Sequence, residues 1–95
     1  MRLPLAGISW VIVGGESGTH AKPFHVEWAT DIQEQCRVSG TAFFLKQLGQ
    51  NPYISGQPLK LRDKHGGDMS EWPADLRCRQ FPAAFYRHTA GQLAV

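Results

Sequence analysis

Two almost wholly apolar runs flank an amphipathic segment in the first half of the chain. The first run covers residues 8–13, has Ser9 as its only polar residue, and stops at the GGESG sequence of residues 14–18. The second run covers residues 41–45. Runs without polar alternation predict strands that are covered on both faces, which is typical of parallel sheets in α/β proteins.

The segment between the runs, residues 25–40, has the periodicity of a helix. Acidic side chains gather on one face, and Gly40 provides a left-handed C-terminal stop. Another face carries Val26, Ala29, Ile32, Gln33 and Cys36. Because strand, helix and strand follow one another at this spacing, residues 1–49 are predicted to form a single βαβ unit with parallel strands and a right-handed crossover.

Residues 50–82 are predicted to be an irregular extension that contains Trp, Gly and Pro. Residues 51–58 are expected to form a loop, whereas residues 59–62 and 76–79 alternate in a way that predicts one loose pair of strands. Residues 83–95 show no clear period, so a disordered tail is expected there.

The predicted fold class is therefore α/β: one βαβ unit with an irregular C-terminal extension. Two strands and one helix leave one face of the sheet and its outer edges uncovered, so the unit is incomplete by itself. Cover by the tail, a second copy of the chain, or a larger α/β protein would complete it. Self-association of the isolated chain, most simply as a twofold dimer, is the corresponding prediction.

Length, composition and charge narrow the class of protein only moderately. The 95 residues suit one small soluble domain, and no apolar run is long enough to cross a membrane. The net charge is +2, and residues 48–95 carry the whole excess, with six basic and four acidic side chains. Cys36 and Cys78 form neither a disulfide framework nor a Cys-x-x-Cys pair, so a reduced cytoplasmic setting is expected.

Candidate chemistry is expected where the two parallel strands end. Sites in α/β sheets and barrels form at the carboxyl ends of strands. The candidate ligand-binding residues are Gly14, Gly15, Glu16, Ser17, Lys46 and Gln47. Glu16 can accept a ligand ammonium or hydroxyl and Lys46 can hold an anion; the alternative is a tight turn with one ion pair between them. GGESG matches neither the dinucleotide-binding fingerprint nor the Walker A motif.

A second candidate is a nucleic-acid surface in the other half of the chain. Basic residues occur there near Tyr53 and Trp72, and phosphate contacts combined with base stacking need that mixture. The residues concerned are Lys60, Arg62, Lys64, Arg77 and Arg79. Four acidic side chains lie among them, so a solvated face of mixed charge is the alternative.

No metal site and no catalytic residue are predicted. The four histidines lack a Cys or carboxylate at a corroborating ligand spacing, so loop or surface positions are expected for them. They are His20, His25, His65 and His88. Cys36 lies on the apolar helix face and Cys78 in an alternating segment, so both are expected to be small core residues and not nucleophiles.

Several motifs, taken in order, resemble one known family. WVIVGGESG is followed by a Trp-containing helix that ends in Gly, then by FFLKQLG, HGGDMSEWPADLR and QFP. Over roughly residues 8–82 the chain is similar to the C-terminal part of the phage gp-thirty-seven/gp-sixty-eight family. This resemblance implies that residues 8–47 are late β/α units of a barrel and that Glu16, Ser17 and Lys46 line its mouth.

Members of that family resemble radical S-adenosylmethionine enzymes, whose N-terminal cysteine cluster holds a four-iron–four-sulfur centre. That cluster needs three closely spaced cysteines, whereas Cys36 and Cys78 stand far apart and the N-terminal half is absent. The resemblance therefore implies that this chain alone holds neither the cluster nor S-adenosylmethionine. The chain is expected to be a truncated product, a split partner or a cloned fragment.

Three functions follow as hypotheses. The first is a non-autonomous, catalytically inert C-terminal portion of a radical-S-adenosylmethionine-like phage protein, on the substrate side of the barrel mouth. The second is a small module that binds a nucleotide or nucleic acid through GGESG and the basic residues. The third is a dimeric remnant without a ligand. The expected partners are a second copy or a separate N-terminal half, and no membrane.

Overall fold

The computed structural model describes residues 2–82 and 92–95. In chain order its elements are β1 (Trp10–Gly14), β2 (Phe24–His25), α1 (Val26–Ser39), β3 (Ala42–Gln47), β4 (Pro52–Ile54), β5 (Gln57–Pro58), the short 3-10 helices η1 (Met69–Glu71) and η2 (Ala74–Leu76), and β6 (Gln92–Ala94). Among the described residues no helix is both long and apolar enough to span a membrane. The mixed α/β class predicted for the chain is confirmed.

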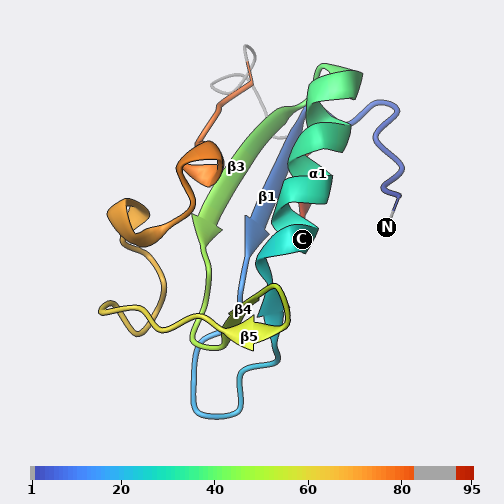
Figure 1. Ribbon diagram of the computed structural model, residues 1–95. Helices are drawn as coiled ribbons and strands as arrows, with labels where there is room; N and C mark the ends of the chain where they lie inside the picture. The colour runs from blue at the N-terminus through green and yellow to red at the C-terminus, as the bar shows by residue number, and fades with distance from the viewer. Residues whose placement is uncertain (1, 83–91) are drawn as a thin grey trace.

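A parallel sheet in the order β3–β1–β6 forms one layer, and α1 lies across one of its faces (Figure 1). β1 and β3 pair in parallel from Trp10↔Ala42 to Val13↔Leu45, as the βαβ prediction requires. The expected two-stranded sheet is wrong, because β6 adds a third parallel strand beside β1. The described strands form open sheets, not a closed barrel. Of the predicted disordered tail, residues 83–91 lie outside the described residues.

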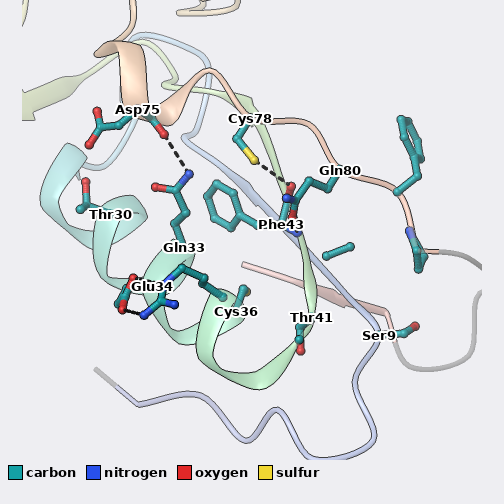
Figure 2. Close-up of a pocket in the computed structure, with 15 residues that line it drawn as sticks. Ser9, Thr30, Gln33, Glu34, Cys36, Thr41, Phe43, Asp75, Cys78 and Gln80 are labelled. Atoms are coloured by element: carbon teal, nitrogen blue, oxygen red, sulfur yellow. Dashed lines mark hydrogen bonds and ion pairs between the residues drawn. The ribbon is translucent and has the colours of Figure 1, made fainter.

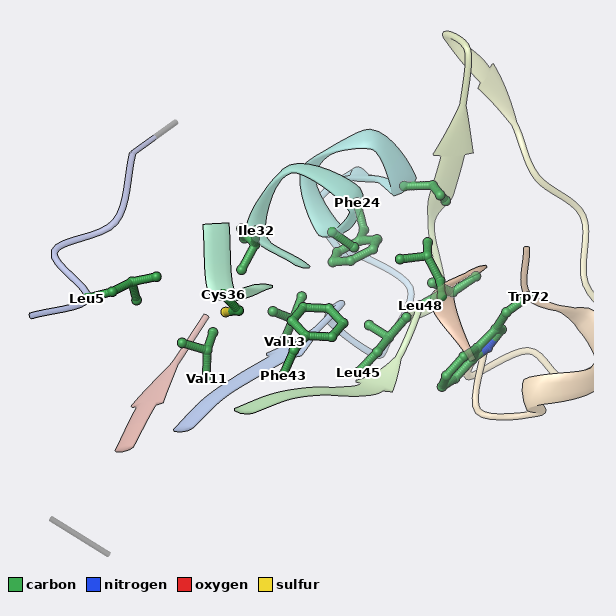
Figure 3. Close-up of a cluster of buried hydrophobic side chains, with 13 residues drawn as sticks. Leu5, Val11, Val13, Phe24, Ile32, Cys36, Phe43, Leu45, Leu48 and Trp72 are labelled. Atoms are coloured by element: carbon green, nitrogen blue, oxygen red, sulfur yellow. The ribbon is translucent and has the colours of Figure 1, made fainter. Parts of the chain in front are cut away.

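The core lies between α1 and the sheet (Figure 3). Alternate strand residues Val11, Val13, Phe43 and Leu45 face the helix, and each is at most 1% exposed. The helix contributes Val26, Ala29, Ile32 and Cys36, which are all buried and are spaced three or four residues apart. The period of two in the strands and the period of 3.6 in the helix therefore converge on one apolar layer. Gly40 ends α1 at φ 69°, the left-handed stop that was predicted.

The opposite face of the sheet carries a smaller aromatic cluster. Trp10 meets Phe44 edge to face with ring centroids 6.0 Å apart, and Phe81 lies 5.4 Å from each of these two rings. Phe81 itself is 56% exposed. Residues just before Pro82 therefore cover part of this second face.

That same segment covers the outer edge of β3. Cys78 O accepts a hydrogen bond from Leu45 N at 3.0 Å. Gln80 N donates to Phe43 O, and the side-chain oxygen of Gln80 accepts from Phe43 N. Arg79 donates from Nε to Leu45 O at 3.0 Å and from its terminal nitrogen to Lys46 O at 2.6 Å. The expectation of an open edge is therefore wrong for β3, since its backbone groups are already paired and cannot template another strand.

Removing this edge cover is expected to promote association between chains. Arg79→Met frees two β3 carbonyl groups and removes a guanidinium that lies 5.3 Å from the Phe44 ring. We expect a loss of about 1–2 kcal/mol in unfolding free energy and a concentration-dependent increase in sedimentation coefficient. Arg62→Met is the matched control, because Arg62 is exposed and its ion pair to Glu71 is long, at 4.0 Å. Equal association by the two variants would contradict the edge-cover role.

A small second sheet, in the order β2–β4–β5, packs near the first turn of α1. Its hairpin lies within residues 51–58, which were predicted to be a loop. Ser55 (φ 51°) and Gly56 (φ 77°) both adopt positive φ, as a two-residue hairpin turn requires, and Glu27 accepts from Ser55 N at 2.6 Å. This hydrogen bond lowers the pKa of Glu27. The predicted pairing of residues 59–62 with 76–79 is wrong, because Arg79 bridges Phe44 instead.

Candidate functional site

Three glycine-containing loops pack backbone against backbone at the carboxyl ends of β1 and β3. A Cβ atom built on Gly15 would lie 2.2 Å from Leu48 O, and one on Gly49 would lie 2.7 Å from the Gly15 backbone. A Cβ atom on Gly66 would in turn lie 2.7 Å from Gly49 O. No larger residue fits at these three positions without a backbone shift. The glycines of GGESG, KQLG and HGG are therefore needed for loop packing.

Hydrogen bonds fix the packed loops to one another. Gly15 N donates to Gln47 O at 3.1 Å, and Gln47 Nε2 returns a bond to Gly15 O at 3.0 Å. Leu48 N donates to Gly66 O at 2.9 Å. Gln50 N donates to Glu16 O at 2.8 Å, so the backbone that carries Glu16 is held from the β3 side. The carboxyl end of the sheet is consequently a rigid platform.

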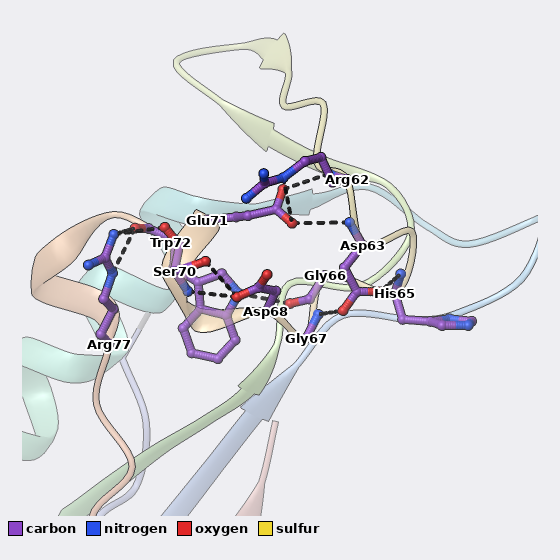
Figure 4. A network of polar contacts seen from close by, with 10 residues as sticks. All are labelled: Arg62, Asp63, His65, Gly66, Gly67, Asp68, Ser70, Glu71, Trp72 and Arg77. Carbon is purple, nitrogen blue, oxygen red and sulfur yellow. Dashed lines mark hydrogen bonds and ion pairs between the residues drawn. The ribbon is translucent and has the colours of Figure 1, made fainter.

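The HGGDMSEW segment, residues 65–72, is held by a network of polar contacts next to these loops (Figure 4). Trp72, 2% exposed, donates from its indole nitrogen to Gly66 O at 2.8 Å. Glu71 accepts from the backbone nitrogens of Arg62 (2.6 Å) and Asp63 (3.1 Å). These hydrogen bonds join the segment to the neighbouring loops and give it a structural role.

A cavity of about 540 Å³ opens at the carboxyl ends of β1 and β6, beside the first two turns of α1. Figure 1 shows that the arrowheads of β1 and β3 and the start of α1 lie at the same end of the molecule. The lining residues are Val13, Gly14, Gly15, Glu16, Lys22, Pro23, Phe24, His25, Trp28, Ile32 and Val95. Its place in the fold is the one where parallel α/β sheets bind ligands.

The wall formed by β2 and α1 is aromatic. His25 and Trp28 both line the cavity, and their ring centroids are 4.6 Å apart. Tyr53, from β4, lies 5.5 Å from His25. Trp28 is 47% exposed, although the neighbouring Ala29 is fully buried. The three rings therefore form a row whose outermost member, the indole, remains accessible.

A larger hollow, about 1080 Å³, lies between α1 and residues 75–82 (Figure 2). Its lining includes Ser9 and Thr41, which directly precede β1 and β3, so it sits at the amino ends of the strands. Gln33 Nε2 spans it to donate to Asp75 O at 2.9 Å. Because it lies away from the carboxyl ends and is bridged by the protein itself, we assign the candidate site to the smaller cavity.

The predicted ligand residues divide into two groups. Gly14, Gly15 and Glu16 line the carboxyl-end cavity. Gln47 is used in loop packing, and Ser17 and Lys46 are exposed outside the cavity lining. Sequence reasoning did not predict that Lys22, Phe24, His25, Trp28 and Ile32 line this cavity. One signal was available: Trp28 occupies a helix position off the apolar face, where a large ring has no core to fill.

The alternative ion pair between Glu16 and Lys46 is wrong. Among the described residues no ion pair joins them, and Glu16 Oε1 instead accepts a long hydrogen bond of 3.4 Å from Lys22 N. The register shifts at the end of β1, so Gly14 pairs with Gln47 and Lys46 is left out of the pairing. Such a bulge re-aims the side chains that follow it.

A double-mutant cycle on Glu16→Gln and Lys46→Gln tests this separation. Both side chains are exposed and unpaired with each other, so each replacement should change the unfolding free energy by less than about 0.5 kcal/mol. The coupling energy should stay below about 0.3 kcal/mol, as is usual for independent sites. Thermal unfolding of the four proteins measures it, and coupling near 1 kcal/mol would restore the ion pair.

The five predicted nucleic-acid residues do not form one free basic surface. Arg79 is bound to β3 carbonyl groups, and Arg77 donates to the carbonyl oxygens of Ser70 and Trp72 at 3.0–3.2 Å. Lys60 and Lys64 are exposed and line a shallow hollow of about 360 Å³. Arg62 is exposed beside Glu71. Two of the five cations are thus used to hold the fold.

The cysteines do not fit an iron–sulfur cluster. Cys36 is 1% exposed in the core, and burial raises the pKa of its thiol, with a smaller contribution from Cys78. Cys78 Sγ donates to Phe43 O at 3.7 Å. Neither thiol lines the carboxyl-end cavity, and within residues 2–82 and 92–95 no three His, Cys, Asp or Glu side chains are grouped to hold a metal ion.

Comparison with known proteins identifies the family of the chain. Searches of curated proteins and of solved structures found no significant similarity. The model of a family described as "Protein of unknown function (DUF5131)" matches residues 1–91. That match covers the β1–α1–β3 unit, the glycine-packed loops and the Trp72 segment, and the chain belongs to this family.

Proposed function

We propose that this chain forms the substrate-side mouth of a larger radical-S-adenosylmethionine-like β/α protein and binds the substrate in its carboxyl-end cavity. The observation that carries the proposal is the position of that cavity. It lies at the carboxyl ends of parallel strands, with Gly14, Gly15 and Glu16 on its rim. The order of motifs that resembles the phage gp-thirty-seven/gp-sixty-eight family supports the larger context.

The proposal assigns cluster binding and substrate binding to two different polypeptide regions. The cysteines of this chain are placed for packing, so an iron–sulfur cluster would be held by a separate cysteine-rich region. The residues that line the carboxyl-end cavity bind and orient the substrate. The apolar walls exclude water, and the Glu16 carboxylate accepts a hydrogen bond from a polar group of the substrate. The chain alone is therefore catalytically inert.

Anaerobic reconstitution tests the division. The chain alone, given iron, sulfide and S-adenosylmethionine, should bind no stoichiometric cluster and release no cleavage product. A cysteine-cluster polypeptide encoded beside it should bind the chain and should cleave S-adenosylmethionine. Stoichiometric iron and sulfide on this chain alone, with a cluster absorption band, would overturn the proposal. So would the failure of every neighbouring cysteine-cluster polypeptide to bind it.

A nucleic-acid-binding module is the second candidate, and one observation favours it. Lys60, Arg62 and Lys64 are exposed within five residues of one another. Binding through them would weaken steeply with salt, with a slope of log affinity against log salt of about −2 to −3 for three phosphate contacts. The loss of Arg77 and Arg79 to internal bonds makes this surface small, which is why the cavity is preferred.

A further inference from the structure

The walls of the carboxyl-end cavity are largely apolar. Val13, Phe24 and Ile32 provide buried hydrophobic surface, and the adjoining strand end contributes glycine backbone. The volume of about 540 Å³ falls within the range of small-molecule sites. A ligand that fills this space buries a face of ring or aliphatic character.

The accessible indole of Trp28 makes a ring the better choice. Indole presents a large rigid surface for stacking, and every nucleobase has a π-face that can use it. The ring centroid of His25 lies 4.6 Å from that of Trp28 and 5.5 Å from that of Tyr53. The row of rings restricts the indole on the protein side while 47% of Trp28 stays exposed. The indole is thus preorganised for a planar ligand.

Two of the residues that line the cavity, Glu16 and Lys22, have side chains of opposite hydrogen-bonding character. A carboxylate accepts hydrogen bonds, and an ammonium group donates them. Protein donors use Glu16 lightly, through the 3.4 Å bond from Lys22 N. Their charges cancel, so the rim suits a neutral ligand edge that offers a donor next to an acceptor. Cytosine, adenine and guanine offer this arrangement with an exocyclic amine as a donor.

We propose that the carboxyl-end cavity binds the base of a nucleoside that carries an exocyclic amine. The ring stacks on Trp28, the amine donates to Glu16, and a ring or carbonyl acceptor faces Lys22. The inference deepens the proposed function by naming the chemical class of the substrate, and it rests on that function for calling the ligand a substrate.

Matched nucleosides that differ by one amine test the proposal by titration calorimetry with the chain. Cytidine should bind at least tenfold more tightly than uridine, and guanosine more tightly than inosine, because the weaker partner of each pair lacks the exocyclic amine that donates to Glu16. Glu16→Gln should reduce these ratios to below about threefold, since an amide both donates and accepts. Trp28→Leu should weaken all four ligands by roughly tenfold or more, within the range of one lost stacking contact.

Two control variants accompany the titration. Trp28→Phe should retain most of the affinity, and Lys64→Gln, outside the cavity, should retain all of it. Thermal unfolding of each variant verifies that it is folded. Equal affinity within both pairs, unchanged binding by Trp28→Leu, or tighter binding of free tyrosine or tryptophan would overturn the proposal. The titration needs no cluster, so its failure is separate from failure of the reconstitution test.

Discussion

Replacing Gly15 by Ala is expected to cost more than about 3 kcal/mol of unfolding free energy, because the new methyl group has nowhere to go. Its Cβ atom would lie 2.2 Å from Leu48 O and 2.9 Å from Gly49 Cα, and both neighbours are backbone atoms. In a domain of this size that loss corresponds to a fall in Tm of about 12 °C or more. Thermal unfolding followed by circular dichroism measures it.

The adjacent glycine supplies the control. A Cβ atom on Gly14 would meet only ordinary contacts of 3.6–3.8 Å, so Gly14→Ala should change the unfolding free energy by less than about 1 kcal/mol. A large difference between neighbouring glycines separates steric exclusion from a general need for flexibility. If both variants melt together with the wild-type chain, the three loops are not packed as described.

Replacing Trp72 by Ala should have the second large effect, a loss of about 3–5 kcal/mol. The ring is 2% exposed, donates to Gly66 O and lies 5.4 Å from the Arg79 guanidinium. Its removal leaves a cavity behind the glycine-packed loops and releases the segment that covers the β3 edge. Denaturant unfolding should show a lower midpoint, and the variant should self-associate.

Trp28→Ala is the control for that substitution. Trp28 is 47% exposed, so the same change of residue type should cost less than about 1 kcal/mol. Two tryptophans of one chain thus separate two purposes: Trp72 stabilises the platform, and Trp28 faces the cavity. A larger loss for Trp28→Ala than for Trp72→Ala would reverse these assignments.

The features that were predictable from sequence depend on local patterns. The βαβ unit, its parallel strands and the stop at Gly40 follow from periodicity and from one residue that tolerates positive φ. Gly14, Gly15 and Glu16 were placed near a site because strand ends in α/β folds share one edge.

The features that were missed depend on contacts between distant residues. β6 has only three residues and owes its existence to pairing with β1. The hairpin of β4 and β5 turns at Ser55 and Gly56, which read as loop residues, and the turn is held by Glu27 from α1. The register shifts after Val13, so Lys46 is left out of the strand pairing, and no local sequence pattern predicts such a bulge.

Ligand binding at the carboxyl end of the sheet can be located residue by residue with an amide-shift titration. The ¹⁵N-labelled chain is titrated with the four nucleosides and with a set of small ring-bearing fragments. We predict that the largest shifts fall on the amides of Gly14, Gly15 and Glu16 and on the indole N–H of Trp28. The largest shifts at Gln33 and Arg37, in the amino-end hollow, or at Lys60 and Lys64 would contradict the assignment.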